Sequence, residues 1–227
     1  MARRRLPPQP GEGPCNRDNS AMDLTVAMRT ARSTRRHRLD PVPDEIIYRV
    51  IDNARFAPSG GNRQPWRVIV VKDPAARAGL SEIYRQSWYE FHAPLFAAPG
   101  EPPQPDYYAD HLYLVPVQLV VLVSIAGITT TNRALDTSRV VGGAAIYPFV
   151  QNLILGIRAE GLGTTLTTVL VPVEDEVKQL LRIPDGYSVA AHLGVGWPEQ
   201  PLPARLSRFP VEEFTTVDSF DGNPLRG

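Results

Sequence analysis

The sequence predicts an α+β domain in which helices and strands are packed in layers. Its 227 residues suit one domain of ordinary size with a substantial core. Apolar runs typical of buried strands mix with amphipathic segments, but without the strict strand–helix alternation of a doubly wound fold. No Gly-x-Gly-x-x-Gly motif follows a strand, so a dinucleotide-type Rossmann site has no support.

Residues 1–21 are rich in Arg, Pro and Gly, so we expect a disordered tail followed by one folded domain over 22–227. A short helix is expected over 23–31. A second helix is expected over 43–57, because Pro43 suits the first helical position and Asp44 and Glu45 suit the positive end of the dipole.

In the middle of the chain, apolar runs alternate with residues that interrupt regular secondary structure. A nearly continuous apolar run predicts a central strand over 67–72, and a helix is expected over 73–91. Residues 94–105 carry too many prolines for regular structure and should form a mobile loop. Another central strand is expected over 118–126.

The second half begins with a predicted helix over 137–160 that is apolar on almost every face. One small domain can hardly bury such a helix, so a second subunit is its simplest cover. The glycines at 161 and 163 end this helix. The remaining expected elements are strand 164–170, helix 173–181, strand 189–196 and a C-terminal arm over 198–227 with a short extended segment at 211–217.

Composition limits the function classes. Lys plus Arg and Asp plus Glu both total 24, so the net charge is zero and we expect no nucleic-acid partner. The single cysteine cannot form an internal disulfide, which fits a reducing cytoplasm, and the four histidines show no metal-ligand spacing. No apolar run suits a signal peptide or a membrane span.

Four short segments carry the chemistry. Each has an ordinary structural explanation when taken alone: a solvated basic run, a helix-to-strand turn, a helix end before a Thr-rich strand, and a surface arginine. They are Arg32-Ser33-Thr34-Arg35-Arg36, the turn from Ala57 to Trp66, the run from Gly161 to Thr168, and Arg208-Phe209-Pro210.

Together and in this order, the segments resemble the FMN-dependent nitroreductase superfamily over about residues 23–217. The resemblance implies a mostly antiparallel central sheet flanked by helices, and an intertwined homodimer that binds FMN. It also implies that Arg32 and Ser33 grip the flavin phosphate and ribityl chain. Arg35 falls beside the pyrimidine edge of the flavin ring, and the basic segment as a whole binds the cofactor through Arg32, Ser33, Thr34, Arg35 and Arg36.

The resemblance assigns the other segments as well. The turn reaches the flavin of the neighbouring subunit with Pro58, Ser59 and Gly60, while Asn62 braces the turn together with Gln64 and can also reach the flavin. The third segment passes the N5 side of the ring, closest to the variant found in iodotyrosine deiodinases, with Leu166, Thr167 and Thr168. Arg208 grips the phosphate. Trp66 is expected to pack in the core.

The sequence therefore predicts an FMN-dependent NAD(P)H oxidoreductase that reduces a nitroaromatic or quinone acceptor by ping-pong hydride transfer. The flavin carries the chemistry, and Arg35 tunes it. Many nitroreductases have a Glu-Gly pair in the third segment that this chain lacks, so NADH and NADPH both stay open. Two alternatives are a reductive dehalogenase-like enzyme and a protein that sequesters flavin. The aromatic residues near 84–89 and 107–108 are either helix packing or a lid over the substrate.

Overall fold

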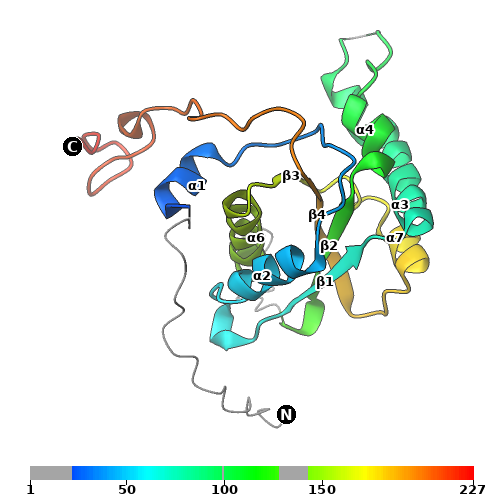
Figure 1. Cartoon of the computed structure of the whole chain (residues 1–227). Coiled ribbons are helices and arrows are strands. Elements are labelled where there is room, and N and C mark those ends of the chain that lie inside the picture. Colours follow the sequence, from blue (N-terminus) through cyan, green and yellow to red (C-terminus); the bar gives the residue numbers. More distant parts are fainter. Residues whose placement is uncertain (1–21, 99, 128–142) are drawn as a thin grey trace.

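The computed structural model describes residues 22–98, 100–127 and 143–227 as a three-layer arrangement of helices around one sheet (Figure 1). The sheet has the order β1-β2-β4-β3, and all of its neighbouring strands are antiparallel, which confirms the predicted α+β class. The predicted tail, residues 1–21, lies outside the described residues. The strands are β1 (Trp66–Val71), β2 (Val117–Ser124), β3 (Gly163–Thr167) and β4 (Tyr187–Gly196).

One face of the sheet is covered by α2 (Asp44–Ala54) and α6 (Tyr147–Ala159), with α1 (Leu24–Thr30) against α6. Their apolar stripes meet every second side chain of the central strands, because side chains alternate across a strand. This core includes Val50, Phe149, Leu153, Leu119, Val121 and Leu193.

The other face is covered by α3 (Pro74–Ser87), α4 (Tyr107–His111) and α7 (Glu174–Leu181). Leu80 and Val177 pack there against Val120 and Leu122 of β2. Strand β2 is thus buried on both faces, which is why its sequence reads as a continuous apolar run rather than an alternating one.

Helix α4 was not predicted, because five residues are too few to show a helical period. The N-cap carboxylate of Asp106 accepts a hydrogen bond from the amide of Ala109 at 2.8 Å. The predicted helix 73–91 is α3 continued by a π-helical turn, Trp88–His92, and the expected loop begins with a 3₁₀ turn, Ala93–Phe96.

The predicted helix over 137–160 was wrong at its start. Helix α6 begins only at Tyr147, with Pro148 in its first turn, where the missing N–H of proline costs nothing. A 3₁₀ turn, Gly143–Ala145, precedes it, and residues 137–142 lie outside the described residues.

Two further expectations were wrong near the C-terminus. The strand predicted over 164–170 ends at Thr167, since the chain then turns and the amide of Val171 donates to the carbonyl of Thr168. The segment 211–217 is not extended but starts with a 3₁₀ turn, Val211–Glu213, in which the amide of Phe214 donates to the carbonyl of Val211.

None of the helices in the described ranges is long and apolar enough to cross a lipid bilayer.

Candidate functional site

The basic segment docks on the edge of the sheet, beside β3. Ser33 forms a parallel bridge with Thr164, and the amide of Thr34 donates to the carbonyl of Thr164 at 2.9 Å. The hydroxyl of Thr165 donates to the carbonyl of Thr34 at 2.5 Å. A Cβ atom at Gly163 would lie 2.6–2.7 Å from the Thr34 side chain, so only glycine allows this close approach.

The same segment is held from its other side by the chain that leaves β4. His37 bridges Pro198, the amide of Arg38 donates to the carbonyl of Trp197, and the amide of Glu199 donates to the carbonyl of Arg36. Figure 1 shows the blue segment after α1 running beside the orange segment after β4. Two stretches far apart in sequence therefore fix the backbone of the arginines.

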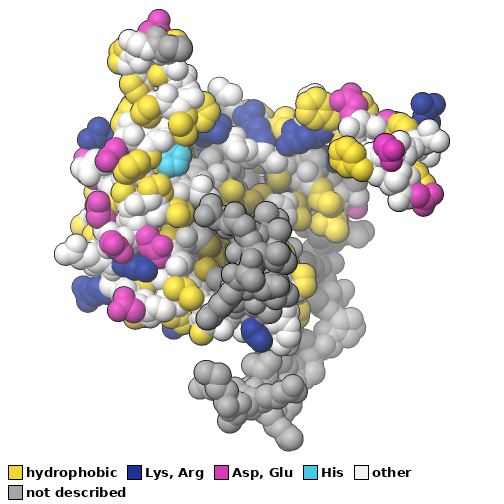
Figure 2. All heavy atoms as spheres, turned by 180° about the vertical axis from the view of Figure 1, so that it is seen from behind, with side chains coloured by type: hydrophobic (Ala, Val, Ile, Leu, Met, Phe, Trp, Pro, Cys, Tyr) yellow, Lys and Arg dark blue, Asp and Glu magenta, His cyan; other side chains and the backbone are white. Residues whose placement is uncertain are grey.

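A hollow of about 230 Å³ opens on this segment. The guanidinium groups of its three arginines have no carboxylate within 4 Å and no hydrogen bond within the described part of the chain, unlike Arg38 and Arg49, which pair with acids. In Figure 2 basic side chains gather in the notch between the α3–α4 part and the C-terminal arm. The hollow, lined by Arg32, Ser33, Thr34, Arg35, Arg36 and Gln200, is suited to an anion.

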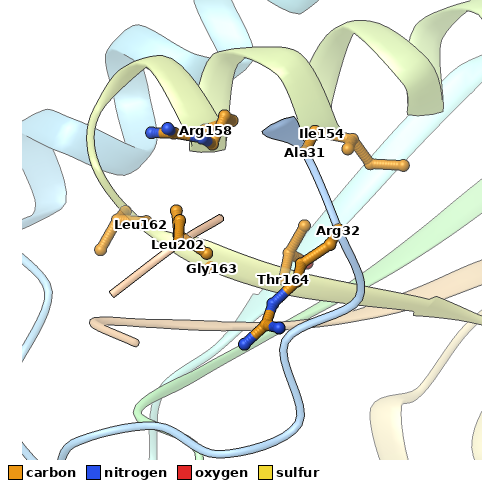
Figure 3. A pocket seen from close by; sticks show the side chains of 8 residues that line it. All are labelled: Ala31, Arg32, Ile154, Arg158, Leu162, Gly163, Thr164 and Leu202. Atoms are coloured by element: carbon orange, nitrogen blue, oxygen red, sulfur yellow. The ribbon is translucent and has the colours of Figure 1, made fainter. Parts of the chain in front are cut away.

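A smaller cavity of about 10 Å³, room for one water molecule, adjoins it and shares Arg32 (Figure 3). The Nε of Arg158 in α6 donates to the hydroxyl of Thr30 at 2.9 Å. The hydroxyl of Thr164 is buried here and has no hydrogen-bond partner in the ranges that the structure describes. A water molecule or ligand oxygen would satisfy that hydroxyl.

The third predicted segment runs along the edge strand. Leu166 is 38% exposed, Thr167 is half-buried and Thr168 is exposed. Since β3 is the last strand of the sheet, its outer side beyond Thr165 has no neighbouring strand in the described chain, and backbone groups there are open to a ligand.

The turn that contains Pro58, Ser59, Gly60 and Asn62 does not join the basic segment within one chain. It precedes Trp66, which pairs with Val123, and Val123 pairs with Ser188, at one end of the sheet. The basic segment lies beside Thr164, which is level with Val195 and Val117 at the opposite end and beyond the opposite edge. Figure 1 shows this separation.

The bracing predicted inside this turn is confirmed. The backbone amide of Gln64 donates to the hydroxyl of Ser59 at 3.0 Å. The side-chain nitrogen of Gln64 donates to the side-chain oxygen of Asn62 at 3.1 Å. Gly61 has a φ of +62°, which suits glycine. Trp66 packs in the core as predicted, stacked on Phe149 with ring centroids 4.8 Å apart.

Arg208 is exposed and does not line the hollow. Its guanidinium donates to the carbonyl of the preceding Ser207. The amide of Leu206 donates to the carbonyl of Arg29, so this part of the arm lies against the end of α1, just before the basic segment begins.

Sequence reasoning missed Gln200 and the place of Tyr107. The guanidinium carbon of Arg36 lies 3.6 Å from the centroid of the Tyr107 ring. Tyr107 was noted only as part of an aromatic group, and nothing in the sequence pairs it with Arg36. Gln200 gave no signal, because an irregular segment has no periodicity to interpret.

A buried polar cluster lies between α3 and the strands β2 and β4. The side chain of Gln118 donates to the hydroxyl of Ser81 at 3.0 Å, and its oxygen lies 3.3 Å from Nε2 of His192. Burial lowers the pKa of His192 to about 3 and raises the pKa of Tyr84 to about 12. The positive charge of Arg35 lowers the pKa of Tyr84 and so acts against the larger effect of burial.

Comparison with known proteins agrees with this architecture. Residues 28–197 match the family model described as "Nitroreductase family". A 5,6-dimethylbenzimidazole synthase of Rhodospirillum rubrum is 32% identical over 186 residues, which cover 79% of this chain and 85% of the relative. A nitrobenzene nitroreductase of Ectopseudomonas oleovorans is 29% identical over 216 residues, covering 82% and 92%.

Solved structures show the same fold at lower identity. An iodotyrosine deiodinase bound to FMN and 3-iodo-L-tyrosine matches with a TM-score of 0.67 at 22% identity, covering 87% of this chain and 100% of the other. A BluB-like flavoprotein of Clostridium difficile 630 matches with a TM-score of 0.67 at 21% identity and the same coverage.

Proposed function

The chain belongs to the nitroreductase family, and from this premise we propose that it is an FMN-dependent oxidoreductase that takes electrons from NADH or NADPH. Its acceptor is a nitroaromatic or a quinone. The observation that carries the proposal is the hollow in which three arginines, with no acidic partner among the described residues, are fixed against the edge of the sheet.

The residues present fit FMN. Its phosphate is a dianion, and arginine binds phosphate through two parallel hydrogen bonds while staying charged at any physiological pH. The buried Thr164 hydroxyl without a partner and the open edge of β3 offer polar groups next to these cations. When bound, FMN supplies the two-electron chemistry, accepting electrons from the nicotinamide and delivering them to the acceptor.

Each side chain then has a separate task. Arg32 and Ser33 would bind the phosphate, and Arg208, which lies outside the hollow, would have to reach it from the arm. Arg35 would place a fixed positive charge beside the ring, where a cation favours the uptake of electrons. Leu166, Thr167 and Thr168 would contact the ring from the edge of β3. Thr34 contributes its backbone only, since its side chain is buried against Gly163.

We further propose that the site is completed by a second copy of the chain. The turn is too far from the hollow of its own chain to contribute to it, so it would contribute to the hollow of the partner chain. The residues of this turn are Pro58, Ser59, Gly60 and Asn62. Large apolar side chains are exposed on α1, α2 and the arm, which favours burial in a symmetric dimer. They include Leu24, Met28, Tyr48, Phe56, Phe209, Phe214 and Phe220.

The test is anaerobic stopped-flow reduction of the purified, FMN-loaded protein by NADH and by NADPH, followed by reoxidation with a nitroaromatic or a quinone. We expect bleaching of the flavin band by at least one nicotinamide and its return with the acceptor. A protein that gains no flavin absorbance with FMN would contradict the cofactor assignment. Bound flavin that neither nicotinamide reduces would favour a protein that sequesters flavin.

The 32% identity to a 5,6-dimethylbenzimidazole synthase supports a second candidate, a synthase of that kind. Mass spectrometry of the reaction mixture would distinguish the two, because only the second yields 5,6-dimethylbenzimidazole. A halotyrosine added as acceptor tests the reductive dehalogenase alternative in the same experiment.

A further inference from the structure

Arg36 differs from the other two arginines of the hollow in its surroundings. Its guanidinium lies on the face of the Tyr107 ring at 3.6 Å, and the other face of Tyr107 stacks on His111 at a centroid distance of 4.3 Å. An aromatic face behind a guanidinium fixes its plane but leaves its N–H groups free to donate from the edge.

Tyr107 is itself held firmly. The amide of Asp106 donates to the hydroxyl of Tyr89 at 3.0 Å, and that hydroxyl donates to the carboxylate of Asp110 at 3.0 Å. The backbone of Arg36 is fixed by the hydrogen bond from the amide of Glu199. Arg36 therefore joins two rigid supports, the basic segment and the start of α4.

Arg36 and Tyr107 meet on the side of the hollow that faces the start of α4. The segment that leads into α4 protrudes from the body (Figure 1), and Leu95 and Phe96 on it are exposed. A molecule that enters between this segment and the basic segment meets Arg36 on the α4 side. The proposed function assigns Arg32 and Arg208 to the phosphate and Arg35 to the ring, so Arg36 is the arginine of the hollow that is left for a second anion.

We propose that Arg36, positioned by Tyr107, is a specificity-determining residue that binds an anionic oxygen group of the second substrate. This anionic group is a carboxylate or a phosphate. It comes from one of two sources: a phosphate of the nicotinamide nucleotide or a carboxylate on the aromatic acceptor. The inference rests on the proposed function only for the identity of the substrates, since anion binding by Arg36 is measurable without turnover.

The experiment is isothermal titration of the FMN-supplied full-length protein with NADP⁺, with 4-nitrobenzoate and with nitrobenzene as the neutral probe. In Arg36→Gln we expect the dissociation constant of at least one anionic probe to rise about tenfold to a hundredfold, because a hydrogen bond to a charged group is lost. Nitrobenzene and FMN should each change less than twofold. The anionic probe that responds identifies the source.

Matched variants separate binding from folding. Tyr107→Phe keeps the stacking face and should bind like the wild type, while Tyr107→Leu should weaken the same probe as Arg36→Gln. Arg38→Gln is the control, because Arg38 lies on the same segment but pairs with Asp40 and does not line the hollow.

Two results overturn the inference: equal affinity of wild type and Arg36→Gln for both anionic probes, or a rise in the FMN dissociation constant as large as that of the probe. A wild type that does not bind FMN contradicts the proposed function instead. The titrations with NADP⁺ and 4-nitrobenzoate then still compare Arg36→Gln with Arg38→Gln.

Discussion

Arg35 lies in the middle of the basic segment, and its charge has no acidic partner within the described residues. We predict that Arg35→Ala lowers the two-electron potential of bound FMN by tens of millivolts, since 30 mV corresponds to about 1.4 kcal/mol for such a couple. Spectroelectrochemical titration measures this, with Arg38→Ala as the control. A potential that stays the same or rises would show that Arg35 does not face the ring.

His192 is fully buried in the central strand β4, and burial lowers its pKa to about 3. In the unfolded chain it titrates near 6.5, so below that pH the unfolded state takes up a proton that the folded state does not. Stability is therefore lost as pH falls from about 6.5 towards 3. The loss from His192 between pH 7 and pH 5 is about 2 kcal/mol.

Urea unfolding at pH 7 and pH 5 tests this. His192→Gln is less stable than the wild type at pH 7, but its stability should fall by about 2 kcal/mol less on acidification. If His192→Gln lost as much stability as the wild type between the two pH values, His192 would be protonated in the folded state.

The packing of the basic segment on β3 depends on Gly163, where a Cβ would lie 2.6–2.7 Å from Thr34. We predict that Gly163→Ala destabilises the fold by about 1–3 kcal/mol and weakens FMN binding, because the segment must move away from the strand. Gly156→Ala in α6 is the matched control, since its Cβ would meet Val50 at an ordinary 3.4 Å. Equal FMN affinity in both variants would show that the packing at Gly163 does not affect FMN binding.

The C-terminal arm carries Arg208, which is exposed in the single chain. We predict that Arg208→Ala weakens FMN binding by about 1.5–3 kcal/mol, the scale of a hydrogen bond to a charged group. Fluorescence titration with FMN measures this, with the exposed Arg226→Ala of the same arm as the control. An unchanged dissociation constant would remove Arg208 from the site.

Local signals in the sequence were enough for most elements. Pro43, Asp44 and Glu45 predicted the start of α2 to within one residue, because capping acts within one turn; Pro43 is the N-cap, and Asp44 is the first helical residue. The predicted start of α6 was too early. The apolar run gives no sign that the helix begins only at the turn that contains Pro148. The pairing of Ser33 with Thr164 joins residues far apart in sequence, and no local pattern in a single sequence encodes it.

At the scale of the molecule, the candidate site was predicted from four segments, and the structure brings two of them together. The basic segment and β3 meet in one chain, whereas the turn at Ser59 lies at the opposite end of the sheet. The described part of one chain does not bring the turn to the hollow, and in the proposed dimer a second copy would supply that contact. That residues 22–227 form one domain with an arm over 198–227 stays a prediction.

In the proposed dimer, each FMN site takes Arg35 from one chain and Ser59 from the other. Subunit complementation tests it with Arg35→Glu and Ser59→Trp, each expected to be inactive alone. In a mixed dimer one site carries both changes, while the other has both native residues.

The decisive measurement is FMN occupancy and nitroaromatic reduction after the two variants are unfolded together in equal amounts and refolded, with size-exclusion chromatography to confirm dimers. Random pairing gives mixed dimers in about half of the population, and each mixed dimer has one native site of two. We therefore expect about a quarter of the wild-type sites to be restored. Mixed dimers that form without any return of FMN binding or activity would contradict a site shared between two chains.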